Sequence, residues 1–212
     1  MRITAIEPQR HAPERVSLFV DGAFRLGVAA ELVLSAGLRA GDEVDEARLA
    51  ELERRDRGWQ AREAALRLLA VRPRSTAELA RRLRAKGYAE SETAPVLERL
   101  AELGMIDDAA FAGMLARDRV RLRPQGGRRM LGELRAKGVD EDTARAAVAG
   151  ALESESTDER ELARRAAEKW RPRSGEEPVA ARRRLTGYLM RRGFEGELVR
   201  EVIEELLGES EP

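Results

Sequence analysis

The apolar pattern of residues 1–57 is typical of a small β-hairpin module with a helix. Val16–Val20 and Ala23–Val28 are apolar runs of the kind that favours a half-buried strand. Asp21-Gly22 joins them, and this pair suits the two positive φ angles of a type I′ turn. Ile3–Ile6 predicts a third strand. We therefore predict a mixed N-terminal module at residues 1–57.

Helical patterns complete this module and continue beyond it. Ala29–Leu38 predicts a short helix stopped by Gly37, and Val44–Asp56 predicts a second helix. From Trp59 onward the strand signals cease, and Gln60–Val71 predicts the first helix of the remaining chain.

Helix start and stop signals dominate the chain after residue 58. Ser75–Glu78 has the capping-box pattern, in which the hydroxyl accepts from the third amide and the glutamate reaches back. Gly87 suits the left-handed position that ends a helix. Ser91 predicts the start of the next helix, with Pro95 in its tolerant first turn.

A five-residue segment recurs at the ends of three predicted helices. LRAKG occupies Leu83–Gly87 and Leu134–Gly138, and the looser LMRRG occupies Leu189–Gly193. The three glycines are 51 and 55 residues apart. Apolar residues recur eight residues before and one, ten and thirteen residues after each glycine: Leu79, Met130 and Leu185; Tyr88, Val139 and Phe194; Leu97, Val148 and Ile203; Leu100, Ala151 and Leu206. Each unit is predicted to contain helix A, helix B, a glycine turn and helix C.

Repeats of this period are typical of stacked helical units that share a core. We predict a mainly α protein with three-helix repeats at residues 58–105, 106–153 and 154–208, an acidic tail at 209–212, and nine helices after the N-terminal module. Three such units laid side by side would form an elongated, curved body with a long surface.

The amino-acid composition excludes some kinds of site and some classes of protein. The 212 residues contain no cysteine, which excludes disulfides and cysteine metal sites. We see no apolar leader and no apolar run of about 18 residues, so we expect a cytoplasmic protein without a membrane span. Basic and acidic residues number 39 each, which argues against a protein that only coats DNA.

Candidate reactive residues are few. His11 is the only histidine, and an exposed loop residue explains it better than a general base. The chain has neither a phosphate-binding loop motif nor a dinucleotide-binding glycine motif. Asp107-Asp108 suits a helix N-terminus better than a metal site, and Trp59 and Trp170 suit a core better than a base-stacking platform. We therefore predict no catalytic, cofactor-binding or metal-binding residue and no enzyme.

The distribution of charge is uneven. Arg117–Lys137 contains eight basic residues and two acids, and Pro178–Phe194 contains five arginines and no acid. Helix dipoles explain basic residues in last turns, but not the alternation along Arg117–Arg123 or the triple Arg182–Arg184 near a helix start. Two interpretations stay open, local helix electrostatics and a recognition surface for a protein–nucleic acid assembly. Under the second, the candidate partner-binding residues are Arg81, Arg82, Arg117, Arg121, Arg128, Arg129, Arg182, Arg183 and Arg184.

Four segments resemble those of RecX proteins, the regulators of the RecA recombinase. They are Ala65–Tyr88, Gly104–Ala112 (GMIDDAAFA), Gln125–Val139 (QGGRRMLGELRAKGV) and Leu189–Phe194 (LMRRGF), in the order of the family. The N-terminal strands resemble the extension of its longer members. One departure is Gly126-Gly127, where the family commonly has Gly-Pro, and it predicts a looser entry to the following helix.

The resemblance implies a protein without enzymatic activity or cofactor, whose helical repeats lie in the groove of the RecA filament. It implies RecA and the RecA–DNA filament as partners. It also implies inhibition of recombinase, ATPase and co-protease activities, and thus negative modulation of homologous recombination and the SOS response. We expect a monomer with at most weak nucleic-acid binding. The residues alone also permit a helix-turn-helix-like DNA-binding regulator, or a helical scaffold for another partner.

Overall fold

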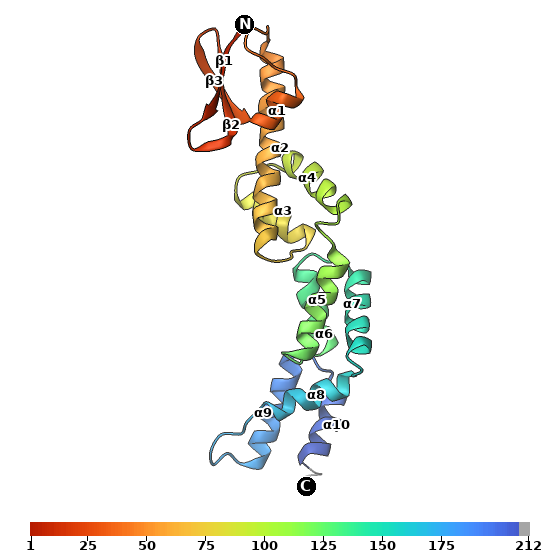
Figure 1. Cartoon of the computed structure of the whole chain (residues 1–212). Helices are drawn as coiled ribbons and strands as arrows, with labels where there is room; N and C mark the ends of the chain where they lie inside the picture. Colours follow the sequence, from red (N-terminus) through yellow and green to blue (C-terminus); the bar gives the residue numbers. More distant parts are fainter. Residues whose placement is uncertain (208–212) are drawn as a thin grey trace. The chain divides into compact units, whose positions relative to one another are not determined.

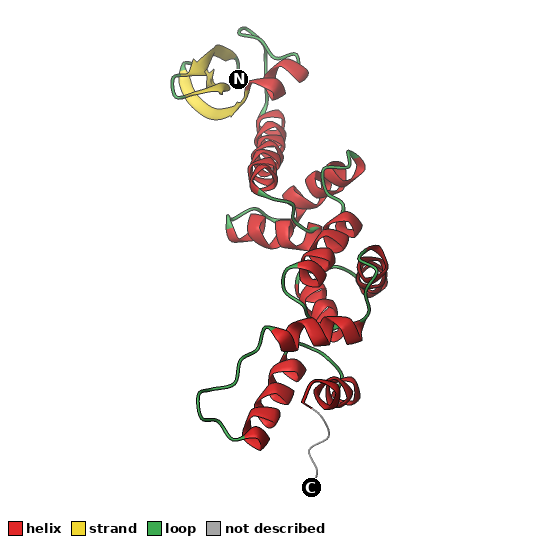
Figure 2. Ribbon diagram, turned by 60° about the horizontal axis from the view of Figure 1, so that its bottom comes forward, coloured by secondary structure: helices red, strands yellow, loops and turns green. Residues whose placement is uncertain are grey.

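The computed structural model of the chain describes residues 1–207, so the predicted tail at 209–212 lies outside the described residues (Figure 1). The chain divides into two compact units. The first contains Met1–Pro73 and Leu79–Met105, and the second contains Arg74–Glu78 and the chain from Ile106 onward. The described residues contain three strands and ten helices, and Figure 2 shows the strands in yellow and the helices in red.

The N-terminal module is a three-stranded antiparallel sheet in the order β1-β2-β3. Its elements are β1 (Ile3–Gln9), β2 (Ala12–Val20), β3 (Ala23–Ala29) and the short helix α1 (Ala30–Ser35). Asp21 and Gly22 have φ angles of 49° and 84°, as the predicted turn requires. Val16, Leu18 and Val20 alternate into the core, where they pack with apolar residues of the following helix. The predicted hairpin and third strand are therefore present.

One continuous helix, α2 (Glu46–Val71), replaces the two helices predicted at Val44–Asp56 and Gln60–Val71. The helix does not end at Asp56. This residue is buried, and its carboxylate accepts hydrogen bonds from Arg15 and Ala29 in other parts of the first unit. Gly58 is tolerated within the helix at a cost of about 1 kcal/mol. The boundary placed between residues 57 and 58 therefore falls inside α2.

The nine helices from α2 onward form three three-helix domains, as predicted. The first comprises α2, α3 (Thr76–Ala85) and α4 (Glu90–Glu102). The second comprises α5 (Asp108–Arg121), α6 (Gly127–Ala136) and α7 (Glu141–Ser154). The third comprises α8 (Glu159–Glu168), α9 (Pro178–Arg191) and α10 (Gly196–Leu207).

The recurring glycines close helices B in all three domains. Gly87, Gly138 and Gly193 have φ angles of 87°, 81° and 88°, which a residue with a side chain rarely adopts. The leucines four residues before them, Leu83, Leu134 and Leu189, are almost fully buried. The recurring five-residue segment therefore contains a buried core leucine and a glycine that ends the helix. Leu206 is the exception among the predicted apolar positions, because it is 40% exposed.

Helix α4 begins at Glu90, before the predicted start at Ser91. The reason is the carboxylate of Glu92, which accepts a hydrogen bond from the backbone N–H of Ala89 at 2.7 Å, so that Ala89 is the N-cap and the helix starts one residue earlier. Arg57 of α2 donates to the same carboxylate at 2.9 Å, and this bond holds the pKa of Glu92 below its ordinary value. The ion pair joins α4 to α2 within the first unit.

Residues 74–78, which include the start of α3, belong to the second unit. The Ser75 hydroxyl accepts from Glu78 N at 3.2 Å, which confirms the first half of the predicted capping box, and it donates to the carbonyl of Lys137 at 2.5 Å. Asp108 accepts from Thr76 N at 2.8 Å. Glu78, buried, pairs with Arg74 at 2.5 Å. These contacts attach residues 74–78 to the second three-helix domain.

Replacing Ser75 by alanine is expected to destabilise the second unit by about 1 kcal/mol, because one helix N–H and one carbonyl lose their partner. Urea unfolding followed by Trp170 fluorescence in a Trp59→Phe background measures the change. Ser154→Ala is the matched control, since this hydroxyl bonds only to Ala151 O of its own helix. Equal stability of the two variants would contradict the role assigned to Ser75.

Candidate partner-binding surface

The arginines of α5 divide into an exposed pair and a partly buried one. Arg117 and Arg121 are four residues apart, so they share a helix face, and both are exposed. Arg119 points elsewhere and donates to Glu133 of α6 at 2.8 Å. This bond holds the pKa of the Glu133 carboxyl below its ordinary value. The alternating arginines of Arg117–Arg123 are therefore explained in part by packing, because Arg119 joins two helices of one domain.

Arg121 forms an ion pair with Glu155, whereas Arg117 acts on the same carboxylate only through its charge, without a hydrogen bond or ion pair in the part of the chain that the structure describes. Arg121 Nε donates to Glu155 Oε1 at 2.7 Å, beyond the end of α7. The bond lowers the pKa of Glu155, which therefore stays ionised to lower pH than a free glutamate. Arg117 makes no hydrogen bond or ion pair with the described residues and presents its guanidinium to solvent.

Arg128 and Arg129 lie in the first turn of α6, where positive charge opposes the helix dipole. The carboxylate of Glu159 compensates, because it accepts from the N–H of Gly127 at 2.7 Å. Arg129 Nη1 donates to the carbonyl of Arg191 at 2.7 Å. Arg128 is exposed, and the described residues offer it no hydrogen bond or ion pair. Helix electrostatics therefore does not account for Arg128.

The triple arginine of α9 separates into two internal contacts and one exposed side chain. Arg182 pairs with Glu204 of α10 at 3.8 Å. Arg184 pairs with Glu176 and lies 5.4 Å from the ring centre of Trp170. Its hydrogen bond lowers the pKa of Glu176. Arg183 is exposed and makes no ion pair or hydrogen bond within residues 1–207.

Arg81 and Arg82 lie on α3 in the first unit, and both are exposed. The other seven predicted residues belong to the second unit. Within that unit Arg117, Arg128 and Arg183 are the three predicted arginines without a hydrogen bond or ion pair to the described residues. We call them the exposed arginines.

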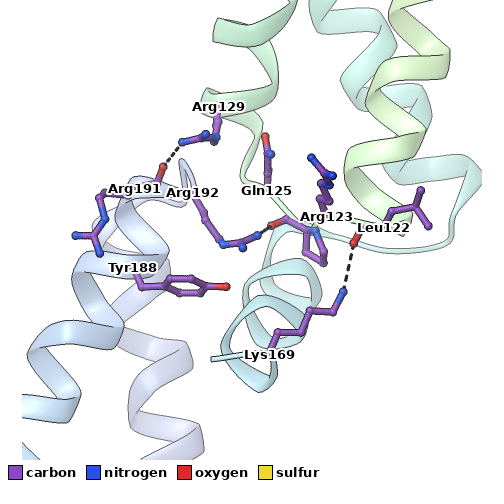
Figure 3. Close-up of a pocket in the computed structure, with 9 residues that line it drawn as sticks. Leu122, Arg123, Gln125, Arg129, Lys169, Tyr188, Arg191 and Arg192 are labelled. Carbon is purple, nitrogen blue, oxygen red and sulfur yellow. Dashed lines mark hydrogen bonds between the residues drawn. The ribbon is translucent and has the colours of Figure 1, made fainter. Parts of the chain in front are cut away.

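A basic pocket lies between the second and third three-helix domains, inside the second unit (Figure 3). Its volume is about 580 Å³. Its lining has five cations and no acid, and comprises Leu122, Arg123, Pro124, Gln125, Arg129, Lys169, Tyr188, Arg191 and Arg192. Only Arg129 was a predicted site residue. The last-turn charges Arg191 and Arg192 were explained by the helix dipole, so the sequence had no signal that they meet the α5–α6 loop.

Backbone contacts hold this pocket together. Gly126 N donates to the carbonyl of Arg192 at 2.9 Å, and Arg192 Nη1 donates to Pro124 O at 3.0 Å. The Arg192 guanidinium also lies 4.6 Å from the ring centre of Tyr188. The looser entry to α6 predicted from Gly126-Gly127 is not found. Both N–H groups are bonded, and a proline at Gly127 could not donate to Glu159.

The described part of the chain holds no other candidate chemistry. Within residues 1–207 no group of three or more His, Asp or Glu side chains is placed to hold a metal ion, and His11 is exposed. No helix among these residues is both long enough and apolar enough to cross a bilayer.

Family models of RecX proteins match four consecutive parts of the chain. The regulatory protein RecX N-terminal domain matches residues 1–45, and the first, second and third three-helix domains of RecX match residues 61–100, 107–148 and 158–203. The regulatory protein RecX of Mycolicibacterium smegmatis is 39% identical over 163 residues, covering 74% of this chain and 85% of the relative. The chain belongs to the RecX family.

Other RecX proteins are similar along nearly the whole chain. The one from Clostridium botulinum is 26% identical over 207 residues, covering 97% of this chain and 96% of the relative. A crystal structure of a regulatory protein RecX is 25% identical, superposes with a TM-score of 0.75, and covers 96% of this chain and 98% of that chain. RecX from Lactobacillus salivarius, 23% identical with a TM-score of 0.60 over 71% of this chain and 97% of that one, supports the fold alone.

Membership of the RecX family confirms the resemblance seen in the sequence. RecX proteins are regulators of RecA and form a family without enzymatic activity. The predicted fold class is confirmed by the three three-helix domains and the N-terminal antiparallel sheet.

Proposed function

We propose that this RecX protein binds RecA and the RecA–DNA filament and inhibits recombinase, ATPase and co-protease activities. Through these activities it restrains homologous recombination and the SOS response. The observation that carries the proposal is the match of all four RecX segments in order along the chain.

The exposed arginines are the side chains best suited to contact such a partner. Arg117, Arg128 and Arg183 have no internal ion pair to break, so their binding to an acidic surface or to phosphates has no such cost. Arg121, Arg182 and Arg184 would first have to leave Glu155, Glu204 and Glu176. Each exposed pair contributes only about 0.2–1 kcal/mol. When several domains bind the same partner at once, their weak contacts add up to a stronger, multivalent interaction.

Reversing the charge of the exposed arginines tests the proposal. The triple variant Arg117→Glu, Arg128→Glu, Arg183→Glu is expected to raise the concentration needed for half-inhibition of RecA ATPase about tenfold or more, since 1.4 kcal/mol is a factor of ten. Arg129 is left intact because it also bonds to Arg191 O. The melting temperature should stay unchanged, since exposed substitutions alter stability by about 0.5 kcal/mol or less.

The control makes charge reversals of the same kind at two other exposed arginines, Arg145→Glu on α7 and Arg200→Glu on α10, whose ion pairs lie within their own helices, and it should leave inhibition unchanged. Unchanged inhibition by the triple variant would remove the exposed arginines from the contact surface. A wild-type protein that leaves RecA ATPase, strand exchange and co-protease activity untouched would refute the inhibitory function itself.

The alternative function, a helix-turn-helix-like DNA-binding regulator, predicts a different result. Its affinity for naked duplex would depend on base sequence and would fall steeply with salt. Inhibition of RecA in the presence of poly(dT) alone, with no preferred duplex sequence, would favour the first function.

A further inference from the structure

The basic pocket has a chemical feature that a simple anion site lacks. Gln125 is only 9% exposed, and its Oε1 has no hydrogen-bond donor among the described residues. Figure 3 shows this side chain between Arg129 and Arg123, among the cations. A buried acceptor without a donor is unfavourable, so a ligand that supplies an N–H group gains affinity by bonding to it.

A second hollow adjoins the first and shares three of its residues. This neighbour has a volume of about 510 Å³ and is lined by Arg119, Arg123, Gln125, Arg129, Gly132 and Glu133. Arg119 and Glu133 pair with each other, so the free charge of this hollow is again positive. Gln125 thus stands where two basic hollows meet, which suits an extended ligand better than a single ion.

We propose that this pocket of the second unit binds a nucleotide unit, with phosphate on the cations and a base N–H on Gln125 Oε1. A phosphodiester has no hydrogen-bond donor for the amide oxygen, whereas cytosine and adenine carry exocyclic amines. Five cations exceed what one carboxylate of a protein partner would neutralise. Arginine forks match phosphate oxygens in pairs. The nucleotide unit has two sources, a single strand of nucleic acid or a free nucleoside phosphate.

The pocket is pre-formed for this role. Arg192 is fixed by Pro124 O and Tyr188, and Lys169 Nζ lies 3.4 Å from Leu122 O. Arg123 and Arg191 are exposed, and their guanidinium groups make no hydrogen bond or ion pair with the described residues, so they can close on a phosphate.

Isothermal titration calorimetry on the purified chain tests the site with four probes: the tetranucleotide of deoxycytidine, an abasic tetramer with the same phosphodiesters, dCTP, and hexaglutamate. The tetranucleotide should bind about three- to tenfold more tightly than the abasic tetramer, as one added hydrogen bond predicts. Gln125→Met should abolish that difference and leave abasic binding unchanged. Tighter binding of the tetranucleotide than of dCTP identifies a strand as the source, and equal binding identifies a free nucleotide.

The variant Arg123→Gln, Arg191→Gln should weaken tetranucleotide binding about tenfold or more and flatten its salt dependence by about 0.7 per lost contact. Its matched control is Arg145→Gln, Arg200→Gln, which should bind as the wild type does. Wild-type affinity in the Arg123/Arg191 variant would overturn the proposal, as would hexaglutamate binding as tightly as the tetranucleotide. RecA is absent from these titrations, so they do not test inhibition of RecA. Failure of the nucleotide site can therefore be distinguished from failure of the inhibitory function.

Discussion

Replacing Asp56 by alanine is expected to destabilise the first unit by about 3 kcal/mol. Asp56 is 4% exposed, and its carboxylate accepts from Arg15 Nη2 at 2.8 Å, from Ala29 N at 2.8 Å and from Gln60 Nε2 at 2.7 Å. Removing one partner of a buried ion pair costs about 3–5 kcal/mol. The low end applies because the Arg15 side chain remains 18% exposed and keeps its bond to Gly27 O.

Urea unfolding followed by Trp59 fluorescence in a Trp170→Phe background reports this change, because Trp59 packs against the core of the N-terminal module. Asp56→Asn keeps the acceptor for Ala29 N but loses the charge, and should cost less than alanine. Glu51→Ala is the control, since its ion pair with Arg54 is exposed and contributes about 0.5 kcal/mol or less. A loss no larger than that of Glu51→Ala would show that the strands are attached to α2 by apolar packing alone.

The second large effect is expected when Gly193 is replaced by alanine. This substitution should destabilise the second unit by about 3 kcal/mol. Two costs add there. The φ of 88° costs a residue with a side chain about 1–2 kcal/mol. The new Cβ would also lie 2.4 Å from the Cβ and 2.6 Å from the N of Arg129, and such overpacking costs about 1–3 kcal/mol.

Two further alanine variants separate these costs. Gly175→Ala has a φ of 70° but open space for a Cβ, so it should show the conformational cost alone. Gly126→Ala has a φ of −70°, but its Cβ would lie 2.4 Å from Gly193 O, so it should show the steric cost alone. Trp170 fluorescence in the Trp59→Phe background measures all three. Equal losses at Gly175 and Gly193 would contradict the close approach of the two domains.

Features set by a few neighbouring residues could be predicted from the sequence. The Asp21-Gly22 turn and the helix stop at Gly87 follow from backbone conformations that glycine and short polar residues tolerate best. The core leucines follow from their spacing on one helix face. The start of α4 was misplaced because Ala89 gave no capping signal, and the bond from its N–H to Glu92 is seen only in the structure.

Features that depend on distant residues could not be predicted. Asp56 resembled a surface acid that ends a helix, and only its partners Arg15 and Ala29, 41 and 27 residues away, make it a buried acceptor within a continuous α2. The candidate arginines looked alike in the sequence. Their internal partners, such as Glu155 for Arg121 at a separation of 34 residues, distinguish them from Arg117, Arg128 and Arg183.

By itself the sequence determined the repeat, its helix stops, its apolar core positions and the RecX family, because each of these is written in residue types at short or fixed spacings. Only the tertiary structure decided which arginines remain exposed and that Gln125 lies among five cations. Contacts such as Gly126 N to Arg192 O join residues whose separation along the chain carries no local signal. Burial and charge pairing arise from which surfaces meet, and that is a property of the packed domains.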